Sequence, residues 1–313
     1  MPGGDTILLT GATGFVGRHV LARLLDRGLP VVATASPGRA PERQDGVDWR
    51  PVDLTDPKAA SGLMAEVRPA RWLHLAWIAT PGKFWSAPEN LHWLSAGAAM
   101  AAAFYAAGGR YALGVGTCAE YGGDRAACRE GETPVEADTV YGRAKVVMGA
   151  GLLAAAQAHG GRAGWARVFF PYGPGEPAGR LIPSVIQAVL KGEVVETTHG
   201  RQVRDFIYVA DVAEALVRLL DAEAEGPVNV GSGVDTSLRQ VIETITDIAG
   251  GADLVRFGAR AAPAHEPPAL VASVDRLRAA TGWQPQTGLR DGLERCIADW
   301  KTRLDPPSAA ATP

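Results

Sequence analysis

The feature that most constrains this 313-residue chain is a glycine-rich turn near its N-terminus, in Ile7-Leu8-Leu9-Thr10-Gly11-Ala12-Thr13-Gly14-Phe15-Val16-Gly17. An apolar run precedes the turn and apolar residues recur at helical spacing after it, which indicates a strand, a turn and a helix. Glycines allow a tight turn and close approach of a diphosphate, and the first N–H groups of the helix face its negative charge. The turn therefore predicts a dinucleotide-binding βαβ unit, with a mere tight connection as the alternative.

Composition narrows the class of partner. Hydrophobic residues make up 47% of the chain and the formal net charge is −3, with basic residues scattered along the sequence. These values are typical of a globular protein that binds a small molecule, and they favour neither nucleic acid nor a membrane surface. No apolar run reaches the roughly 18 residues of a membrane span and no signal-peptide pattern is present, so we expect a cytoplasmic protein.

The three cysteines do not predict a metal site or a disulfide framework. Cys118, Cys128 and Cys296 lack the paired spacing of metal ligands and are too few and too scattered for a set of bridges. We therefore expect no metal.

Alternating short apolar and longer helical segments predict an α/β fold, with a Rossmann-type, doubly wound parallel sheet over residues 1–169. Beyond residue 170, Pro- and Gly-rich segments and short elements indicate a smaller lobe over 170–304. One apolar segment near 227–231 is expected to return to the main sheet, so the lobe is interleaved. The tail 305–313 is expected to be disordered. The expected strands of the main sheet are 6–10, 30–35, 49–52, 72–76, 112–116 and 164–169, and the helices between them are 14–27, 57–67, 90–107 and 139–159.

Three residues form a candidate catalytic group. Thr117 follows the strand expected at 112–116, and Tyr141 and Lys145 are four residues apart on the next helix, so they share one helical face. An ammonium beside a phenol favours the phenolate, which would lower the tyrosine pKa from about 10 and let Tyr141 act as acid or base. The alternative is an exposed helix pair with Thr117 capping a loop.

These motifs together resemble the extended short-chain dehydrogenase/reductase family, in its nucleotide-sugar epimerase, dehydratase and ketoreductase branch. The resemblance extends over nearly the whole chain. Besides the glycine turn and the catalytic group, it rests on Val52-Asp53-Leu54, His74-Leu75-Ala76, Thr117-Cys118-Ala119-Glu120-Tyr121-Gly122, Tyr172-Gly173-Pro174-Gly175, residues 204–213 (RDFIYVADVA), Asn229-Val230-Gly231-Ser232-Gly233 and Gly282-Trp283-Gln284-Pro285.

The resemblance implies a nicotinamide dinucleotide on the main sheet. It places Asp53 at the adenine edge with Leu54 beside it, Ala76 in the cofactor groove, and Lys145 on the nicotinamide ribose. The cofactor residues that it implies are Gly11, Thr13, Gly14, Phe15, Val16, Gly17, Asp53, Leu54, Leu75, Ala76, Trp77, Tyr141 and Lys145.

The resemblance also implies a nucleoside-diphosphate sugar in the smaller lobe. Arg204 would pair with the diphosphate, with a salt bridge to Asp205 or another nearby carboxylate as the alternative. Arg180 would contact the nucleotide, and Glu266 would meet a ribose hydroxyl or remain a solvated loop residue. The other expected substrate contacts are Trp77, Cys118, Ala119 and Phe170.

Two departures from the family pattern concern the sugar. Phe170 stands where many members have an asparagine that seats the diphosphosugar. Trp77 stands where small residues are common, and with the loop at Trp85 it would form an apolar wall that favours a deoxy sugar. Packing is the alternative role of both tryptophans.

Two residues disfavour dehydration. Family dehydratases follow the catalytic threonine with Asp-Glu, and this chain has Cys118 and Ala119 there. A 4-ketoreductase of a 4-keto-6-deoxy sugar and a C4 epimerase remain. A catalytically silent dinucleotide sensor is a third hypothesis from another class.

The residues expected to bind the adenosine ribose favour the reductase over the epimerase. An NAD site usually has a carboxylate after the second strand, and residues 31–39 contain none. Ser36 and Arg39 would instead hold a 2′-phosphate, so NADP(H) is favoured and NAD(H) remains possible. A loop exit with a solvent-facing Arg39 is the alternative.

Two helices rich in small residues bear on the assembly. The helices at 90–107 and 139–159 contain many Ala and Gly residues, and the family pairs such helices in a four-helix bundle. A homodimer is therefore expected, although burial against the chain's own sheet would explain the same composition.

Overall fold

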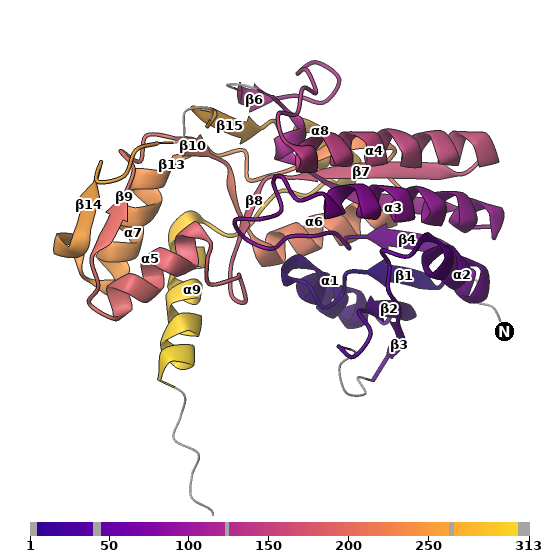
Figure 1. Cartoon of the computed structure of the whole chain (residues 1–313), viewed down its shortest axis with the longest axis horizontal. Helices are drawn as coiled ribbons and strands as arrows, with labels where there is room; N and C mark the ends of the chain where they lie inside the picture. The colour runs from indigo at the N-terminus through magenta and orange to yellow at the C-terminus, as the bar shows by residue number, and fades with distance from the viewer. Residues whose placement is uncertain (1–4, 40–44, 123–124, 263–265, 306–313) are drawn as a thin grey trace, which may run out of the picture.

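A computed structural model describes residues 5–39, 45–122, 125–262 and 266–305 of the chain. Its centre is a seven-stranded sheet, all parallel, in the order β12-β7-β5-β4-β1-β2-β3 (Figure 1). The expected Rossmann-type α/β fold is therefore confirmed. The strands are β1 (Ile7–Thr10), β2 (Val31–Ala35), β3 (Val47–Pro51), β4 (Arg71–His74), β5 (Tyr111–Thr117), β7 (Arg162–Val168) and β12 (Gly226–Val230).

Helices cover both faces of this sheet because side chains alternate between its faces along each strand. Ile7 and Leu9 of β1 pack into one apolar core with helices α1 (Phe15–Asp26) and α6 (Val209–Asp221). Leu8, between them, packs into the other core. That core lies under α2 (Pro57–Val67), α3 (Glu89–Ala106) and α4 (Val140–His159), which form one layer. The result is a three-layer α/β/α arrangement.

Strand β1 lies at the point where the strand order reverses, with β2 on one side and β4 on the other. Ligands of such sheets bind beyond the carboxyl ends of the strands at this point. The chain places its glycine-rich turn there, directly after β1.

The second lobe has its own core, between α5 (Leu181–Leu190), α7 (Leu238–Ala249) and α9 (Leu289–Leu304). These helices lie on the left of Figure 1, with the short strands β9 (Val195–Thr197) and β14 (Val255–Phe257) beside them. A four-stranded sheet lies along the top of Figure 1, between this lobe and the end of α4. Its strands are β13 (Thr236–Ser237), β10 (Val203–Arg204), β15 (Ala269–Ala272) and β6 (Arg125–Cys128).

Several C-terminal segments belong structurally to the main sheet. Strand β12, the expected return strand, pairs with β7, and helices α6 and α8 (Asp275–Thr281) pack together beside it. The short pair β8 (Phe170–Tyr172) and β11 (Phe206–Tyr208) joins the two parts. The tail expected to be disordered lies outside the described residues, apart from Asp305.

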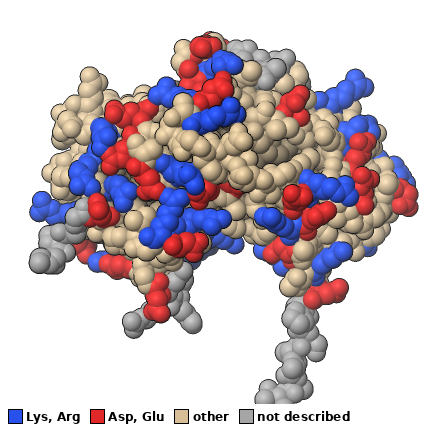
Figure 2. Space-filling model, turned by 180° about the vertical axis from the view of Figure 1, so that it is seen from behind, with Lys and Arg blue, Asp and Glu red and all other residues tan. Residues whose placement is uncertain are grey.

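The described helices and the face drawn in Figure 2 bear on membrane binding and on charged partners. None of the helices in the described part of the chain combines the length and apolar character needed to cross a bilayer. On the face drawn in Figure 2, basic and acidic side chains are intermixed. Within the described residues, no three His, Cys, Asp or Glu side chains gather as a metal site requires.

Candidate active site

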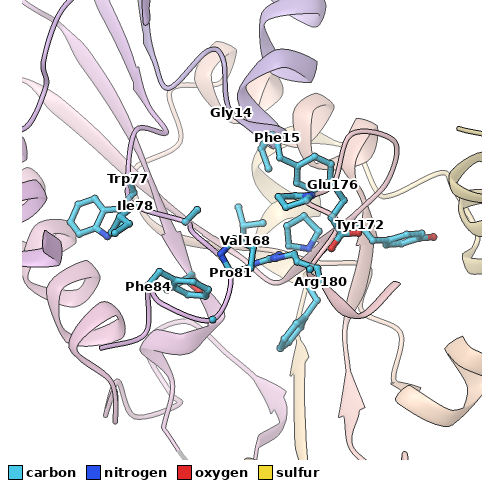
Figure 3. Close-up of a pocket in the computed structure, with 18 of the residues that line it drawn as sticks. Gly14, Phe15, Trp77, Ile78, Pro81, Phe84, Val168, Tyr172, Glu176 and Arg180 are labelled. Carbon is cyan, nitrogen blue, oxygen red and sulfur yellow. The ribbon is translucent and has the colours of Figure 1, made fainter. Parts of the chain in front are cut away.

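One cavity of about 1060 Å³ contains most of the residues expected at the site. It runs from the glycine-rich turn, past the ends of β4 and β5, to the second lobe (Figure 3). Of the predicted site residues, only Arg39 and Ala119 do not line it. Those that line it are Gly11, Thr13, Gly14, Phe15, Val16, Gly17, Ser36, Asp53, Leu54, Leu75, Ala76, Trp77, Thr117, Cys118, Tyr141, Lys145, Phe170, Arg180, Arg204 and Glu266.

The glycine-rich turn forms a cradle that only glycine permits. Gly11 has φ +81°, and a Cβ there would lie 2.7 Å from the Ala76 nitrogen. A Cβ at Gly17 would overlap the Gly11 carbonyl oxygen. Helix α1 begins at Phe15 with no side-chain cap and no acidic residue in its first turn, so its first N–H groups are available. This donor set fits the diphosphate of a dinucleotide.

The adenosine end of the cavity contains Asp53 and Ser36. An Asp53 carboxylate oxygen accepts from the Thr55 backbone N–H at 2.9 Å and from its hydroxyl at 2.6 Å, and these bonds lower the pKa of Asp53. Arg39 is exposed and lies outside the cavity lining. In this structure it therefore corresponds to the solvent-facing alternative.

Thr117 and Tyr141 both line the cavity. Thr117 is the last residue of β5, and Thr139 caps α4 by accepting from the Gly142 N–H at 3.0 Å, which places Tyr141 in the first turn. Burial raises the pKa of the Tyr141 phenol, while the neighbouring Thr117 side chain and the charge of Arg180 oppose this. The expected lowering of this pKa is therefore not found: burial is the largest cause of the shift, Lys145 is not among its causes, and Tyr141 is protonated at neutral pH.

Lys145 is 3% exposed, and its ammonium donates to the Val115 carbonyl oxygen at 2.7 Å. Burial lowers its pKa to about 7, although the charge of Glu120 acts in the opposite direction. The lysine therefore changes charge near neutral pH.

A buried carboxylate that the sequence interpretation did not assign supports Thr117 from behind. Glu120 is fully buried and accepts from the Thr117 N–H at 2.9 Å, from the Trp165 indole at 2.9 Å and from the Arg167 guanidinium at 2.7 Å. Gly116 has no side chain, and the Glu120 and Trp165 side chains occupy the space that a Cβ at this position would need. Because Glu120 lies close to Thr117 in sequence but Trp165 and Arg167 do not, the pattern gave no signal of this network.

Arg204 has a partner within the protein. Its guanidinium donates to Glu266 at 2.8 Å and to the carbonyls of Val203 and Pro267, also at 2.8 Å. The other Glu266 oxygen accepts from Gln202 at 2.9 Å. The geometry corresponds to the salt-bridge alternative for Arg204 and engages the carboxylate expected to meet a ribose.

Arg180 is the cation that extends into the cavity. Figure 3 shows its side chain crossing toward Pro81 and Val168, and no carboxylate of the described residues forms an ion pair with it. Beside it is Glu176, a second group that the sequence interpretation did not assign. Glu176 is 6% exposed, its Oε2 has no hydrogen-bond partner among the described residues, and burial raises its pKa to about 8.

Of the remaining predicted substrate residues, Trp77, Cys118 and Phe170 form an apolar wall of the cavity, and Ala119 lies outside it. Burial raises the pKa of the Cys118 thiol, which leaves a neutral side chain in the wall. The Ala119 N–H donates to the Thr117 hydroxyl at 3.2 Å from outside the cavity. The Phe170 ring lies 5.6 Å from the Arg204 guanidinium.

Comparisons with known proteins agree with this geometry. The sequence model of the NAD dependent epimerase/dehydratase family matches residues 7–231. A UDP-glucose 4-epimerase from Azospirillum brasilense is 29% identical, over 96% of this chain and 92% of its own length.

Solved structures with a similar fold include proteins that bind NAD and UDP-sugars. The UDP-glucose 4-epimerase of Thermus thermophilus in complex with NAD is 26% identical, with a TM-score of 0.83 over 95% of this chain and 99% of that one. MoeE5 in complex with UDP-glucuronic acid and NAD is 28% identical, with a TM-score of 0.82 over 96% of this chain and all of that one. The chain belongs to the NAD dependent epimerase/dehydratase family.

Proposed function

We propose that this protein is an NADPH-dependent 4-ketoreductase of a nucleoside-diphosphate-linked 4-keto-6-deoxy sugar. The observation that carries the proposal is the neutral Tyr141 phenol, which lines the same cavity as Thr117 and the glycine cradle. A protonated phenol at the reaction centre is a proton donor, and ketone reduction requires one.

The chain's own groups have distinct parts in this reaction. NADPH held by the turn at Gly11 would supply the hydride for C4. The Thr117 hydroxyl orients the C4 oxygen by a hydrogen bond, and Tyr141 transfers its proton to that oxygen as negative charge develops. The Lys145 ammonium stabilises the phenolate that Tyr141 leaves and returns a proton to it.

The preference for NADPH rests on the residues that follow β2. Residues 31–39 provide no carboxylate to accept from the ribose hydroxyls, and Ser36 lines the cavity there. NADPH suits a reductant that dissociates after each turnover. The two related structures contain NAD, so NAD(H) is the competing cofactor.

A nucleoside-diphosphate sugar is supported by Arg180, a cavity arginine with no ion pair among the described residues, because a guanidinium fork matches phosphate oxygens. The apolar wall beside Tyr141 supports a deoxy sugar. MoeE5 binds UDP-glucuronic acid and, in another structure, UDP-glucose, and both are nucleoside-diphosphate sugars.

An NAD-dependent C4 epimerase is the second candidate function. It is supported by the names of the relatives, several of which are UDP-glucose 4-epimerases. An epimerase retains its cofactor through two transfers, whereas a reductase consumes one NADPH per turnover.

The test is the oxidation of NADPH and NADH by the purified protein with 4-keto-6-deoxy sugars linked to dTDP, CDP, GDP or UDP. Stoichiometric oxidation that prefers NADPH is the expected result. Bound NAD together with interconversion of C4 epimers, without net oxidation, would replace the reductase with the epimerase.

The Tyr141→Phe variant tests the hypothesis of a silent sensor. A catalytic acid lowers barriers enough that its loss costs about 10²–10⁴-fold in rate. We expect that loss with unchanged cofactor affinity. Equal turnover of the variant and the wild type would remove Tyr141 from the mechanism.

We also propose a homodimer through α3 and α4. Leu91 on α3 and Val147 on α4 are 57% and 54% exposed, which suits helices that pack against a second copy. A cytoplasmic location remains a prediction from the sequence.

A further inference from the structure

The Lys145 ammonium lies over an aromatic ring instead of beside a carboxylate. Its nitrogen is 4.0 Å from the centre of the Trp77 ring and 5.9 Å from that of Trp165. Its one hydrogen bond within the described part of the chain goes to the Val115 carbonyl, and no described carboxylate pairs with it within 4 Å. At 4.0 Å, the π-face of Trp77 is the closest stabilising partner of this cation apart from that carbonyl.

Trp77 is held in this orientation by a fully buried asparagine. The Trp77 indole donates to Asn90 Oδ1 at 2.8 Å, and the Asn90 amide donates to the carbonyls of Phe84 at 2.7 Å and Ala87 at 2.8 Å. Asn90 thus uses its acceptor and both donors to join Trp77 to the loop before α3.

The same loop contacts the catalytic tyrosine. The Phe84 ring meets Tyr141 edge to face at 4.9 Å, and Trp85 does so at 5.8 Å. The Tyr141 N–H donates to the Trp85 carbonyl at 3.1 Å. One segment, from Trp77 to Asn90, therefore contacts both Tyr141 and Lys145.

We propose that Trp77, anchored by Asn90, is a positioning residue that holds the Lys145 ammonium at the reaction centre by a cation–π contact. The inference rests on the proposed function only in taking Lys145 as the catalytic lysine. A cation desolvated by burial needs a compensating partner, and an indole face supplies one without adding a negative charge beside the Tyr141 phenol, where a carboxylate would oppose phenolate formation.

Other charged groups near Lys145 define what the test must separate. Burial is the main cause that lowers the Lys145 pKa to about 7, and Glu120, behind Trp165, raises it. His74 on β4 is buried, and burial together with the Lys145 charge lowers its pKa to about 3, so it is neutral. Tyr141, which lies on helix α4 with Lys145, is neutral as well. A truncation at Trp77 would admit water and relieve desolvation, which would mask the loss of the ring.

The experiment therefore lowers the electron density of the Trp77 indole ring and keeps the ring nearly the same size. Fluorinated tryptophans with one, two and three ring fluorines are incorporated site-specifically at position 77. They retain the indole N–H that bonds Asn90 while weakening the negative π-face. Lys145 is titrated by NMR in the cofactor-free protein with carbon-13-labelled lysine. The chain has only five lysines, so Lys→Arg variants at the four others assign every signal.

The Lys145 pKa is expected to fall with each added fluorine, by about 0.5–1.5 units over the series. The matched control is the same series at Trp93, which lines the cavity 6.3 Å from Trp77, and it is expected to leave the titration unchanged. A Lys145 pKa that is equal across the Trp77 series, or that falls equally in the Trp93 series, overturns the proposal.

A catalytic readout completes the test. The limb of the kcat profile that reports Lys145 is expected to move to lower pH with the NMR value, with little change in KM. If no keto-sugar is reduced but the NMR titration falls with fluorination, the proposed function fails and the contact stands. If reduction proceeds and neither titration nor pH profile moves, the contact fails and the function stands.

Discussion

The Arg204 guanidinium donates to a carboxylate oxygen of Glu266 at 2.8 Å, inside the second lobe and at the wall of the cavity. Arg204 is 5% exposed, and its other hydrogen bonds go to backbone carbonyls. The arginine expected to meet a diphosphate is therefore already neutralised, whereas Arg180, without an ion-pair partner among the described residues, is available for a ligand.

Removing this partner is expected to destabilise the protein. Glu266→Ala leaves the Arg204 charge buried and unpaired, so the free energy of unfolding should fall by about 1–3 kcal/mol in urea titrations. Glu266→Gln keeps an oxygen acceptor and should lose less. The control, Glu243→Ala, breaks an exposed pair with Arg239 and should change stability by about 0.5 kcal/mol or less. Equal values for Glu266→Ala and the control would contradict a structural role of the pair.

The raised pKa of Glu176 predicts a specific dependence of stability on pH. A carboxyl with a pKa of about 8 in the folded state and 4.5 when unfolded binds more protons when folded, so its contribution is complete below pH 4.5 and is lost up to pH 8. Glu176→Gln cannot ionise. Its stability relative to the wild type should therefore rise by up to a few kcal/mol between pH 5 and 8, as thermal unfolding would measure. A constant difference over this range would show that Glu176 is ionised throughout.

Lys145 predicts the opposite slope. Its pKa is about 7 when folded and 10.5 when unfolded, so the buried charge destabilises the fold most below pH 7, and stability recovers as pH rises toward 10.5. Lys145→Met removes this charge at the expense of activity. The variant's gain in unfolding free energy should shrink by up to a few kcal/mol between pH 6 and 10. A gain that is the same at both pH values would mean that the folded lysine keeps an ordinary pKa.

The elements of the main sheet and the local motifs were predictable from the sequence. Periodic apolar segments locate the elements of the main sheet well: the helix predicted at 57–67 matches α2 (Pro57–Val67), and the strand predicted at 112–116 differs from β5 by one residue at each end. Short motifs such as the glycine cradle and the Tyr141–Lys145 spacing can also be recognised in the sequence, because their residues are only a few positions apart.

Pairings between distant residues were not predictable in this way. Arg204 and Glu266 are 62 residues apart, and Glu120 and Arg167 are 47 apart. No local periodicity encodes which partner a buried charge finds. Desolvation, which raises the Tyr141 pKa where the sequence predicted a lowered one, depends on the whole fold around the group and has no sequence pattern.

The exposed apolar residues of α3 and α4 predict how the oligomer would respond to charge. Val147→Glu places a carboxylate in the proposed two-fold contact, where its desolvation opposes association. Light scattering coupled to size exclusion should show a dimer for the wild type and a monomer for the variant. The control is Val194→Glu in the second lobe, where the valine is 56% exposed, and it should leave the mass unchanged. A monomeric wild-type protein would contradict the proposed homodimer and its four-helix bundle.

The turn at Gly11 offers the sharpest test of the cofactor site, because the chain provides a matched glycine. Gly11 and Gly28 both have positive φ, +81° and +67°, but a Cβ at Gly11 would lie 2.7 Å from the Ala76 nitrogen, whereas nothing lies within 4 Å of one at Gly28. Gly28→Ala should therefore cost only the backbone strain of about 1–2 kcal/mol and leave cofactor affinity unchanged. Gly11→Ala must also displace the strand end that lines the cavity, so NADPH affinity in fluorescence titrations should fall by about tenfold or more. Equal affinities of the two variants would place the dinucleotide elsewhere, since no ligand seated on this cradle could ignore a methyl group pressed between β1 and β4.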